Sequence, residues 1–211
     1  MNIYSVMSGA SASVAPVANR FERRKERTRT EILRAAKQVM ARKGVHGTKI
    51  ADIAEAADVG VGTFYLHFET KEALFDALVA DTVGRMKAAI DEARAGAADP
   101  IAEVRVCTAA LCGFASDNRE VFRVVFGHGG TYHDVVREAQ ELFAADIERT
   151  IERGAAAGLF GDVDPRLAAQ AAVGMSTQLL AWWTEHDDVA IDALERTLNA
   201  LTLDGLRRAR P

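Results

Sequence analysis

Apolar residues recur at helical spacing along most of the chain, and the pattern is most informative between residues 48 and 71. It predicts a short helix whose apolar positions lie three or four residues apart: Ile50, Ile53, Ala54 and Ala57. Thr48 precedes this helix and is a candidate N-cap. Asp58–Gly60 then interrupts the pattern with residue types that tolerate the positive φ of a sharp turn. A second short helix, from about Val61 to His67, follows this turn.

The second helix has an unusual outward face. Successive residues of a helix are about 100° apart, which places three side chains on the inward face: Val61, Phe64 and Phe68. The outward positions are Gly62, Thr63 and Leu66, with Tyr65 and His67 on the flanks. This face is small at its start and then presents hydrogen-bonding and methyl-contacting groups, as a helix entering a DNA major groove requires. The spacing alone also fits an ordinary surface helix, because small helix pairs are common.

Short motifs extend over about fifty residues around this helix pair: I-L-x-A-A at 32–36, Gly44, Thr48, I-A at 53–54, G-T-F-Y-L-H-F at 62–68 and K-E-A-L at 71–74. Their order and spacing resemble the DNA-binding domain of the TetR family of bacterial transcriptional regulators. Two positions depart from the family pattern. Asp58 stands where the family often has Gly, and Gly60 stands where it often has Ser or Thr. The second change removes a side-chain cap and a possible phosphate contact from the second helix.

The resemblance implies a cytoplasmic homodimer that regulates transcription, predicted to be a repressor of a palindromic operator on double-stranded DNA. The residues expected to meet base edges or a thymine methyl group are Thr63, Tyr65, Gly62 and Leu66. The residues expected to hold phosphates are Thr48, Tyr65, His67 and Lys71. An architectural DNA binder with little sequence preference is the alternative within the same class.

The composition favours an all-α protein, since it is rich in Ala, Leu, Glu and Arg and has only four Pro. We predict a disordered tail or an over-long start at 1–19, a helix-turn-helix domain at 20–71 and a helical effector-binding and dimerisation domain at 72–211. The DNA-binding domain is expected to contain three helices. No run of about 18 apolar residues occurs, so no membrane span is expected.

Charge is distributed unevenly between the two predicted domains. The whole chain has a formal net charge of −4, which by itself argues against nucleic acid. Residues 20–71, however, hold 12 Lys or Arg and 7 Asp or Glu, a net charge of +5, and the remainder carries −9. A basic head on an acidic body is the asymmetry expected of a DNA-binding module with a separate second domain.

The remaining helices are predicted from apolar stripes and end signals. A basic arm from Arg20 leads into an amphipathic helix that Gly44 ends. The arm could touch phosphates or the minor groove, or be a solvated charge run. Three capping residues begin later helices: Thr70, Asp99 and Asp164. These later helices are expected at 70–95, 100–115, 117–126, 132–156, 165–185 and 189–209.

The last two predicted helices combine small residues with large apolar ones, which lets helices approach closely. The family resemblance implies that they pair with their copies in a four-helix homodimer interface. An intramolecular helix pair in the core fits the same stripes. A dimer agrees with the DNA reading, because one short recognition helix contacts few base pairs.

Aromatic residues are frequent in the predicted body, and an apolar cavity among helices is the default ligand site. The candidate lining residues are Phe114, Phe122, Phe126, Tyr132, His133, Met175, Gln178 and Trp182. Ordinary core packing is the alternative for each of them. We expect a small hydrophobic effector, such as a lipid-derived, aromatic or drug-like molecule, whose binding tilts the long connecting helix and releases the operator.

Signatures of catalysis are weak. Gly60–Gly62 lacks the third glycine and the preceding strand of a dinucleotide fingerprint, and no P-loop, G-x-S-x-G or H-E-x-x-H motif occurs. We predict no enzyme activity, catalytic residue, cofactor or metal site. The competing hypothesis is an enzyme that uses His128, His133 and Asp134. Cys107 and Cys112 are expected to be small buried residues, with redox sensing as the alternative.

Overall fold

The computed structural model describes residues 20–126 and 133–207, and every regular element in these ranges is a helix. The elements are α2 (Arg20–Gly47), α3 (Ile50–Ala56), α4 (Val61–Tyr65), α5 (Lys71–Ala95), α6 (Pro100–Asp117), α7 (Arg119–Phe126), α8 (His133–Ala156), α9 (Pro165–Thr184) and α10 (Ile191–Leu206). The predicted all-α class is therefore confirmed. Among the described helices, none is long and apolar enough to cross a membrane. The predicted tail at 1–19 lies outside the described residues.

Local capping explains where several helices begin and end. The side chains of Thr70, Asp99 and Asp164 each accept a hydrogen bond from the backbone N–H three residues further on. These three predicted N-caps are confirmed. Gly44 has a φ of 70°, so it interrupts α2 as predicted, although helical hydrogen bonding resumes as far as Gly47. A glycine adopts this left-handed conformation without the strain that a side chain adds.

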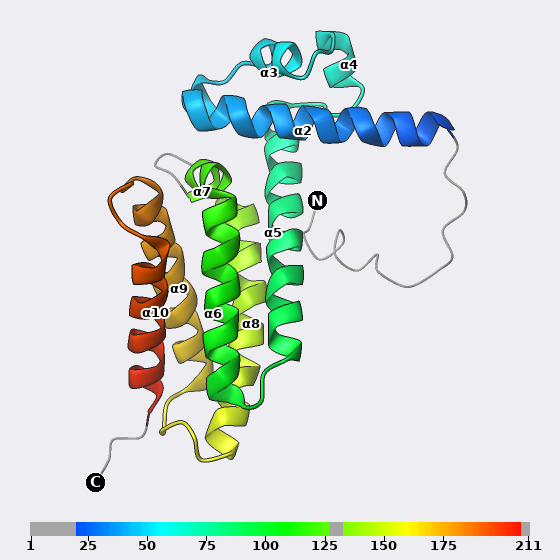
Figure 1. Cartoon of the computed structure of the whole chain (residues 1–211). Coiled ribbons are helices and arrows are strands. Elements are labelled where there is room, and N and C mark those ends of the chain that lie inside the picture. Colours follow the sequence, from blue (N-terminus) through cyan, green and yellow to red (C-terminus); the bar gives the residue numbers. More distant parts are fainter. Residues whose placement is uncertain (1–19, 127–132, 208–211) are drawn as a thin grey trace.

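The helices form a head and a body that share one long element (Figure 1). Helix α2 lies across the top of the molecule beside α3 and α4. Helix α5 runs down from this head into the body, where α6, α8, α9 and α10 lie roughly along it. Within the body, α8 packs on α9, and α6 packs on both α5 and α10.

The hydrophobic core of the head continues into the upper part of the body. Its buried residues include Ile32 and Met40 of α2, Ile53 of α3 and Phe64 of α4. The same cluster includes apolar residues of α5, α7 and α8: Leu74, Phe75, Leu78, Val79, Val83, Val124 and Ala139. The core of the head thus extends beyond residue 71, where we predicted the end of the DNA-binding domain.

The structure corrects four details of the predicted head. The segment at Arg20, expected to be an arm, is already the first turn of α2. Thr48 is not the N-cap of α3, because Lys49 occupies that position. Helix α4 ends at Tyr65 rather than His67. Val61 is 44% exposed instead of inward-facing, because α4 has five residues and only its later part lies over the core.

Gly154 provides a test of packing in the body. A Cβ atom at this position would overlap the ring of the buried Phe160, whereas a Cβ at Gly113 of α6 has no neighbour within 4 Å. We expect Gly154→Ala to lower the free energy of unfolding by about 1–3 kcal/mol through overpacking. The matched control Gly113→Ala should raise it by about 0.5–1 kcal/mol, because alanine favours helix. Urea unfolding followed by circular dichroism measures both changes, and equal changes would contradict this packing.

Candidate DNA-binding face and ligand cavity

The second helix of the head presents a continuous exposed face. Phe64 is fully buried, and its ring packs edge-on against Tyr65 at 5.6 Å between centroids. Tyr65 is nevertheless 51% exposed and Leu66 is 77% exposed, while Gly62 is exposed and Thr63 is partly so. Thus Phe64 fixes α4 to the core and the predicted DNA-facing residues point to solvent. An exposed leucine next to a tyrosine is suited to contact a thymine methyl group and a phosphate or base edge.

Thr48 and Lys71 have structural partners that the sequence did not indicate. The Thr48 side chain is buried, and its hydroxyl donates to the Gly44 carbonyl at 2.7 Å. Lys71 Nζ donates to the carbonyl oxygens of Val45 and Thr48 at 3.0 and 3.1 Å. Lys71 therefore ties the start of α5 to the end of α2. Their predicted role as phosphate ligands is untested, and both side chains have a role in holding the head together.

His67 lies beside basic side chains of α2. Burial is the main cause that lowers the pKa of His67, and the positive charges of Lys25 and Arg29 lower it further. Its Nδ1 atom is buried and has no hydrogen-bond partner among the described residues. The Arg29 guanidinium lies over the Phe68 ring, 5.2 Å from its centroid. Sequence reasoning treated the α2 start as a separate arm and so missed that Lys25 and Arg29 lie close to the recognition segment.

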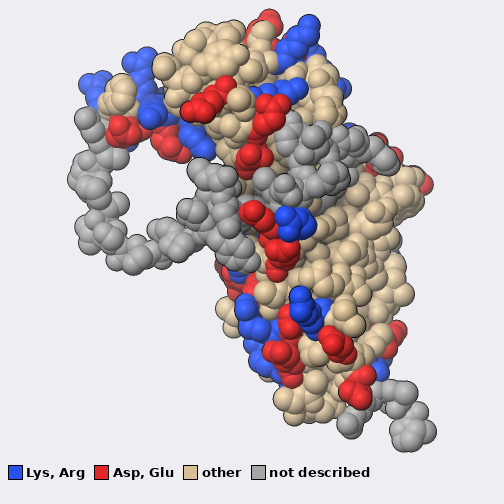
Figure 2. Space-filling model, turned by 180° about the vertical axis from the view of Figure 1, so that it is seen from behind, with Lys and Arg blue, Asp and Glu red and all other residues tan. Residues whose placement is uncertain are grey.

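Basic side chains gather at this end of the head. In Figure 2, blue Lys and Arg side chains cluster around the N-terminal part of α2. The exposed residues of this part include Arg20, Arg23, Arg24, Lys25 and Arg27. This distribution agrees with the net charge of +5 counted in residues 20–71. It gives the head an electrostatic attraction to an anionic backbone.

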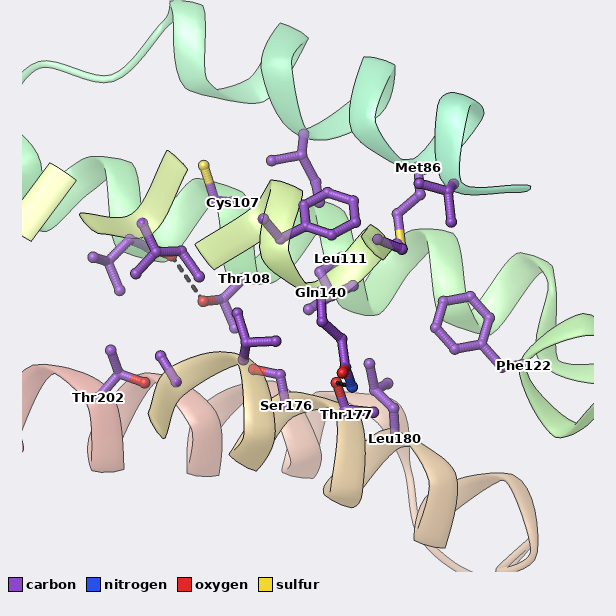
Figure 3. A pocket seen from close by; sticks show the side chains of 18 of the residues that line it. Met86, Cys107, Thr108, Leu111, Phe122, Gln140, Ser176, Thr177, Leu180 and Thr202 are labelled. Carbon is purple, nitrogen blue, oxygen red and sulfur yellow. Dashed lines mark hydrogen bonds between the residues drawn. The ribbon is translucent and has the colours of Figure 1, made fainter. Parts of the chain in front are cut away.

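The body contains a cavity among α5, α6, α7, α8 and α9, and Thr202 of α10 also lines it (Figure 3). Its volume is about 150 Å³. On the same measure one water molecule needs about 10–15 Å³, so the space exceeds that of a few ordered waters. The wall is mainly aliphatic and aromatic and includes Val83, Met86, Leu111, Phe122, Phe143 and Leu180. Figure 3 shows Met86 and Phe122 toward one end and Cys107 and Thr108 toward the other.

Polar groups interrupt this apolar wall at several places. Near the middle, Gln140 of α8 and Thr177 of α9 meet across the cavity, with Nε2 and Oγ1 3.4 Å apart (Figure 3). Ser176 lies beside Thr177 in the same wall. Further along, Arg94 and Glu103 contribute charged groups to the wall. An apolar space with a few polar groups is the usual composition of a small-molecule site.

The predicted ligand residues are only partly in this cavity. Phe122 lines it, as predicted. Phe114, Met175, Gln178 and Trp182 do not line it; Gln178 and Trp182 are exposed, and Phe114 and Met175 pack in the neighbouring core. Tyr132 and the side chains of Phe126 and His133 lie outside the described residues, as does the proposed catalytic set of His128, His133 and Asp134.

The cavity is lined mostly by aliphatic residues that sequence reasoning did not select. Helix α5 alone contributes Val79, Val83, Met86, Ile90 and Arg94. Their three- and four-residue spacing marks an inward helix face but cannot distinguish a filled core from a cavity. Cys107 also lines the cavity, and Cys112 is buried, with burial raising its pKa to about 12. Within the described residues, no group of three or more metal-ligating side chains is present.

A buried ion-pair network, which we call the clasp, joins the lower part of α5 to α6 and α8. Lys87 Nζ lies 2.7 Å from Asp91 Oδ2 and 3.0 Å from Asp146 Oδ2 of α8. Arg94 Nη1 lies 2.9 Å from Asp91 Oδ1 and 3.3 Å from Asp146 Oδ2. Arg94 Nε lies 3.1 Å from Glu103 Oε1 of α6. Asp146 and Glu103 are both 6% exposed, so removing one partner would leave a buried charge, which costs about 3–5 kcal/mol.

Further donors saturate the carboxylates of the clasp. Thr150 Oγ1 donates to Glu103 Oε1 at 2.8 Å, and Arg153 donates to Glu103 Oε2. Arg149 donates to Asp146 Oδ1. Burial lowers the pKa of Lys87, but the hydrogen bonds that it donates to Asp91 and Asp146 outweigh this effect, so its pKa is raised overall. The network therefore holds three helices together beside the cavity.

Helix α7 connects the cavity with the head and with α9. Phe122 faces the cavity, while Val124 belongs to the core of the head. Arg119 donates to the Trp183 carbonyl at 2.7 Å, and its guanidinium lies 4.2 Å from the Trp183 ring centroid. Arg123 donates to the Thr184 carbonyl. Helix α7 thus links the wall of the cavity to the core of the head and to the end of α9.

These features define a class of protein: a basic helix-turn-helix head joined by one long helix to a body with an apolar cavity. Comparison with models of known protein families supports this class. Residues 32–78 match the model of bacterial regulatory proteins of the tetR family, and residues 97–206 match the tetracyclin repressor-like C-terminal domain. The chain belongs to the TetR family and is a DNA-binding transcriptional regulator.

Individual relatives share both parts of the chain. The HTH-type transcriptional repressor KstR2 of Rhodococcus jostii (strain RHA1) is 27% identical over 187 residues, covering 84% of this chain and 90% of that protein. The structure of the fatty acid degradation regulator FadR from Bacillus halodurans has a TM-score of 0.78 at 24% identity, covering 86% of this chain and 97% of that one. FadR from Bacillus subtilis in complex with stearoyl-CoA has a TM-score of 0.76 at 21% identity, covering 84% and 99%. The last two likenesses show a shared fold.

The contacts of Lys71 predict a structural role in the head, which can be tested separately from a contact with DNA. We expect Lys71→Met to lower the free energy of unfolding by about 1–3 kcal/mol, because two backbone carbonyls lose their shared donor. Lys49→Met changes an exposed lysine of the same head and should have little effect on stability. Thermal unfolding of the purified protein measures both. Unchanged stability in Lys71→Met, with weaker DNA binding, would restrict Lys71 to the phosphate role.

Proposed function

We propose that the protein is a homodimeric repressor that binds a palindromic operator in the cytoplasm and is released by a small hydrophobic effector. The exposed face of α4 is the observation that carries the DNA part of this proposal. Tyr65 and Leu66 project from a helix that Phe64 anchors, and basic residues of α2 lie beside it. A rigid helix with a small first turn and polar or methyl-contacting groups suits a major groove.

In the proposed complex, Thr63, Tyr65, Gly62 and Leu66 meet base edges, and Tyr65 and His67 contact phosphates. Lys25 and Arg29 add positive charge on the α2 side of this surface. A phosphate beside His67 would favour its protonated form and offset the effect of the neighbouring cations. Because several phosphates are neutralised, operator affinity should fall steeply with salt.

The proposed homodimer uses an exposed stripe on the last two helices. On α9 the exposed residues recur every three or four positions: Leu167, Ala171, Gly174, Gln178 and Trp182. On α10, Leu201 is 56% exposed. Alanine and glycine allow close approach of a second copy, while the leucines and Trp182 supply apolar area. We propose an interface role for Trp182 and Gln178 in place of the ligand role predicted from the sequence, because both are exposed and neither lines the cavity.

The proposed effector binds the cavity and shifts α5. The cavity is lined by α5 residues from Val79 to Arg94, and α5 also carries Leu74 and Phe75 of the head's core. A ligand that favours a different position of α5 would therefore change the orientation of the head. The structure of Bacillus subtilis FadR in complex with stearoyl-CoA supports a ligand with a long apolar part in a body of this fold.

Operator selection from random duplexes tests the DNA role. We expect the purified protein to enrich a palindrome with two half-sites and to prefer it by about 10³-fold or more over unrelated DNA. Tyr65→Ala should lose about 1–3 kcal/mol per half-site and so abolish specific binding, while the dimer stays folded. Tyr65→Phe keeps the ring packed on Phe64 and isolates the hydroxyl.

The outcomes of the selection are distinct. Enrichment of a palindrome that an extract of small molecules releases supports the regulator together with its switch. Enrichment without release by any extract argues against the effector. No enriched sequence points to an architectural DNA binder, and unchanged operator affinity in Tyr65→Ala removes Tyr65 from the DNA contacts.

A charge on the proposed dimer face tests the homodimer. We expect Leu201→Arg to weaken self-association by at least about a hundredfold, because two unpaired guanidinium groups would be buried at the interface. Leu66→Arg is a matched control, since Leu66 is an exposed leucine of the head. Sedimentation equilibrium without DNA measures both variants. A Leu201→Arg dimer as stable as the unaltered one would place the interface elsewhere.

A further inference from the structure

The last turn of α9 is held by two arginines of α7 that are four residues apart. Arg119 donates to the Trp183 carbonyl at 2.7 Å. Arg123 donates from both Nε and Nη2 to the Thr184 carbonyl, with Nε at 3.1 Å. Residues four apart lie on one face of a helix, so the two side chains reach successive carbonyls of α9 from the same face of α7. We call these two contacts the arginine clamp.

The clamp supplies donors to backbone groups that the helix itself cannot satisfy. The last carbonyls of a helix have no partner within it. Thr184 is fully buried, and among the described residues no donor other than Arg123 reaches its carbonyl. A buried carbonyl without a donor costs free energy, so the position of Arg123 is well determined. Arg119 is also held by a cation–π contact, because its guanidinium lies 4.2 Å from the centroid of the Trp183 ring.

Helix α7 lies between α9 and the head. It packs on both α2 and α9. Figure 1 shows it below α2, at the end of the body where α9 turns into α10. Val124 of α7 is buried in the core of the head. In the body, the connecting helix α5 packs on α6 and α8. Helix α7 is thus a direct connection between α9 and the head, separate from α5.

The same turn of α9 belongs to the surface assigned to the dimer. Trp182 is exposed on the proposed interface, whereas the next residue, Trp183, is buried beneath Arg119. In such a dimer the paired copies of α9 form the centre. The position of each head relative to this centre then determines the distance between the two copies of α4. Dimers of this kind read half-sites about 34–36 Å apart, or multiples of that distance.

We propose that the arginine clamp sets the spacing of the half-sites that the dimer accepts, a role that rests on the homodimer and the operator proposed above. Arg119 and Arg123 are then specificity-determining residues that do not touch DNA. Two hydrogen-bonded points on one helix face fix both the position and the rotation of α7 on α9, whereas apolar packing is not directional. A head held at a fixed angle accepts one separation, because each inserted base pair shifts a half-site by about 3.4 Å and about 36°.

Operators with different spacers test the proposal. The series keeps both half-sites of the selected palindrome and changes the number of base pairs between them, and fluorescence anisotropy measures the affinity of the full-length protein. We expect the unaltered protein to lose about tenfold in affinity when one base pair is added or removed, comparable with a mismatched base pair. In Arg123→Met this loss should shrink to about threefold or less. Its best affinity should fall by about threefold to tenfold, because the heads have to be ordered on binding.

Two controls separate spacing from other effects. Arg105→Met removes an exposed arginine of α6 and should leave the spacing profile unchanged. A duplex with a single half-site should bind Arg123→Met and the unaltered protein equally, because neither clamp arginine belongs to the head. If Arg123→Met fails to fold, Arg119→Met takes its place. The Trp183 carbonyl also accepts from the His186 backbone N–H at 3.0 Å, so this second variant leaves no buried carbonyl without a donor.

A measurement without DNA tests the same orientation. Glu55 is an exposed residue of α3, so Glu55→Cys in a background of Cys107→Ser and Cys112→Ala gives each head one spin label. Double electron–electron resonance measures the distance between the two labels of a dimer. We expect one narrow distance distribution with the clamp intact and a broader one in Arg123→Met. Arg105→Met should leave the distribution unchanged.

The results that would overturn the proposal are specific. An unchanged spacing profile and distance distribution in a folded clamp variant would exclude it, and so would an equal loss of affinity for a single half-site. Failure of the proposed function gives another pattern. If no palindrome is enriched but the label distances broaden in Arg123→Met, the operator is removed and the clamp remains the contact that orients the heads. A monomeric protein would exclude both.

Discussion

Helix α5 belongs to two hydrophobic cores at once, and this constraint links the DNA-binding head to the body. Leu74 and Phe75 are buried with the residues of α2 and α4, whereas Met86 and Ile90 are buried with α6, α9 and α10. Because packed interiors resist small displacements of their side chains, α5 cannot shift in one core without disturbing the other. The cavity lies along the same helix, so the proposed effector would contact the element that carries the head.

The clasp fixes the position of the connecting helix α5 relative to α6 and α8. A buried ion pair contributes little net stability, because desolvation offsets most of its attraction. It does fix geometry, since Asp146 and Glu103 hold α5 through Lys87 and Arg94. Removing Lys87 or Arg94 would leave buried carboxylates without one of their cationic partners, which costs about 3–5 kcal/mol.

The elements and most of their ends could be predicted from local sequence. Thr70, Asp99 and Asp164 cap their helices because a short side-chain oxygen reaches the N–H three residues on, which depends on few distant contacts. The exposed face of α4 followed from the 100° step between residues, with Phe64 and Phe68 buried as expected. The same 100° rule predicted the wrong side for Val61, which is exposed because the five-residue helix α4 begins beyond the edge of the core.

The sequence by itself determined the helical class, the helix-turn-helix motif and its charge, because propensity, caps and periodicity act over a few residues. Only the tertiary structure decided which apolar faces enclose a cavity and which meet solvent. Trp182, Gln178 and Leu180 all lie on α9. Trp182 and Gln178 are exposed, however, while Leu180 lines the cavity. The ion pairs of Arg94 and Lys87 join helices distant in sequence, so no local pattern could specify them. Those distant contacts are set by how α5, α6 and α8 pack together, which is information that the spacing of residues along one helix does not contain.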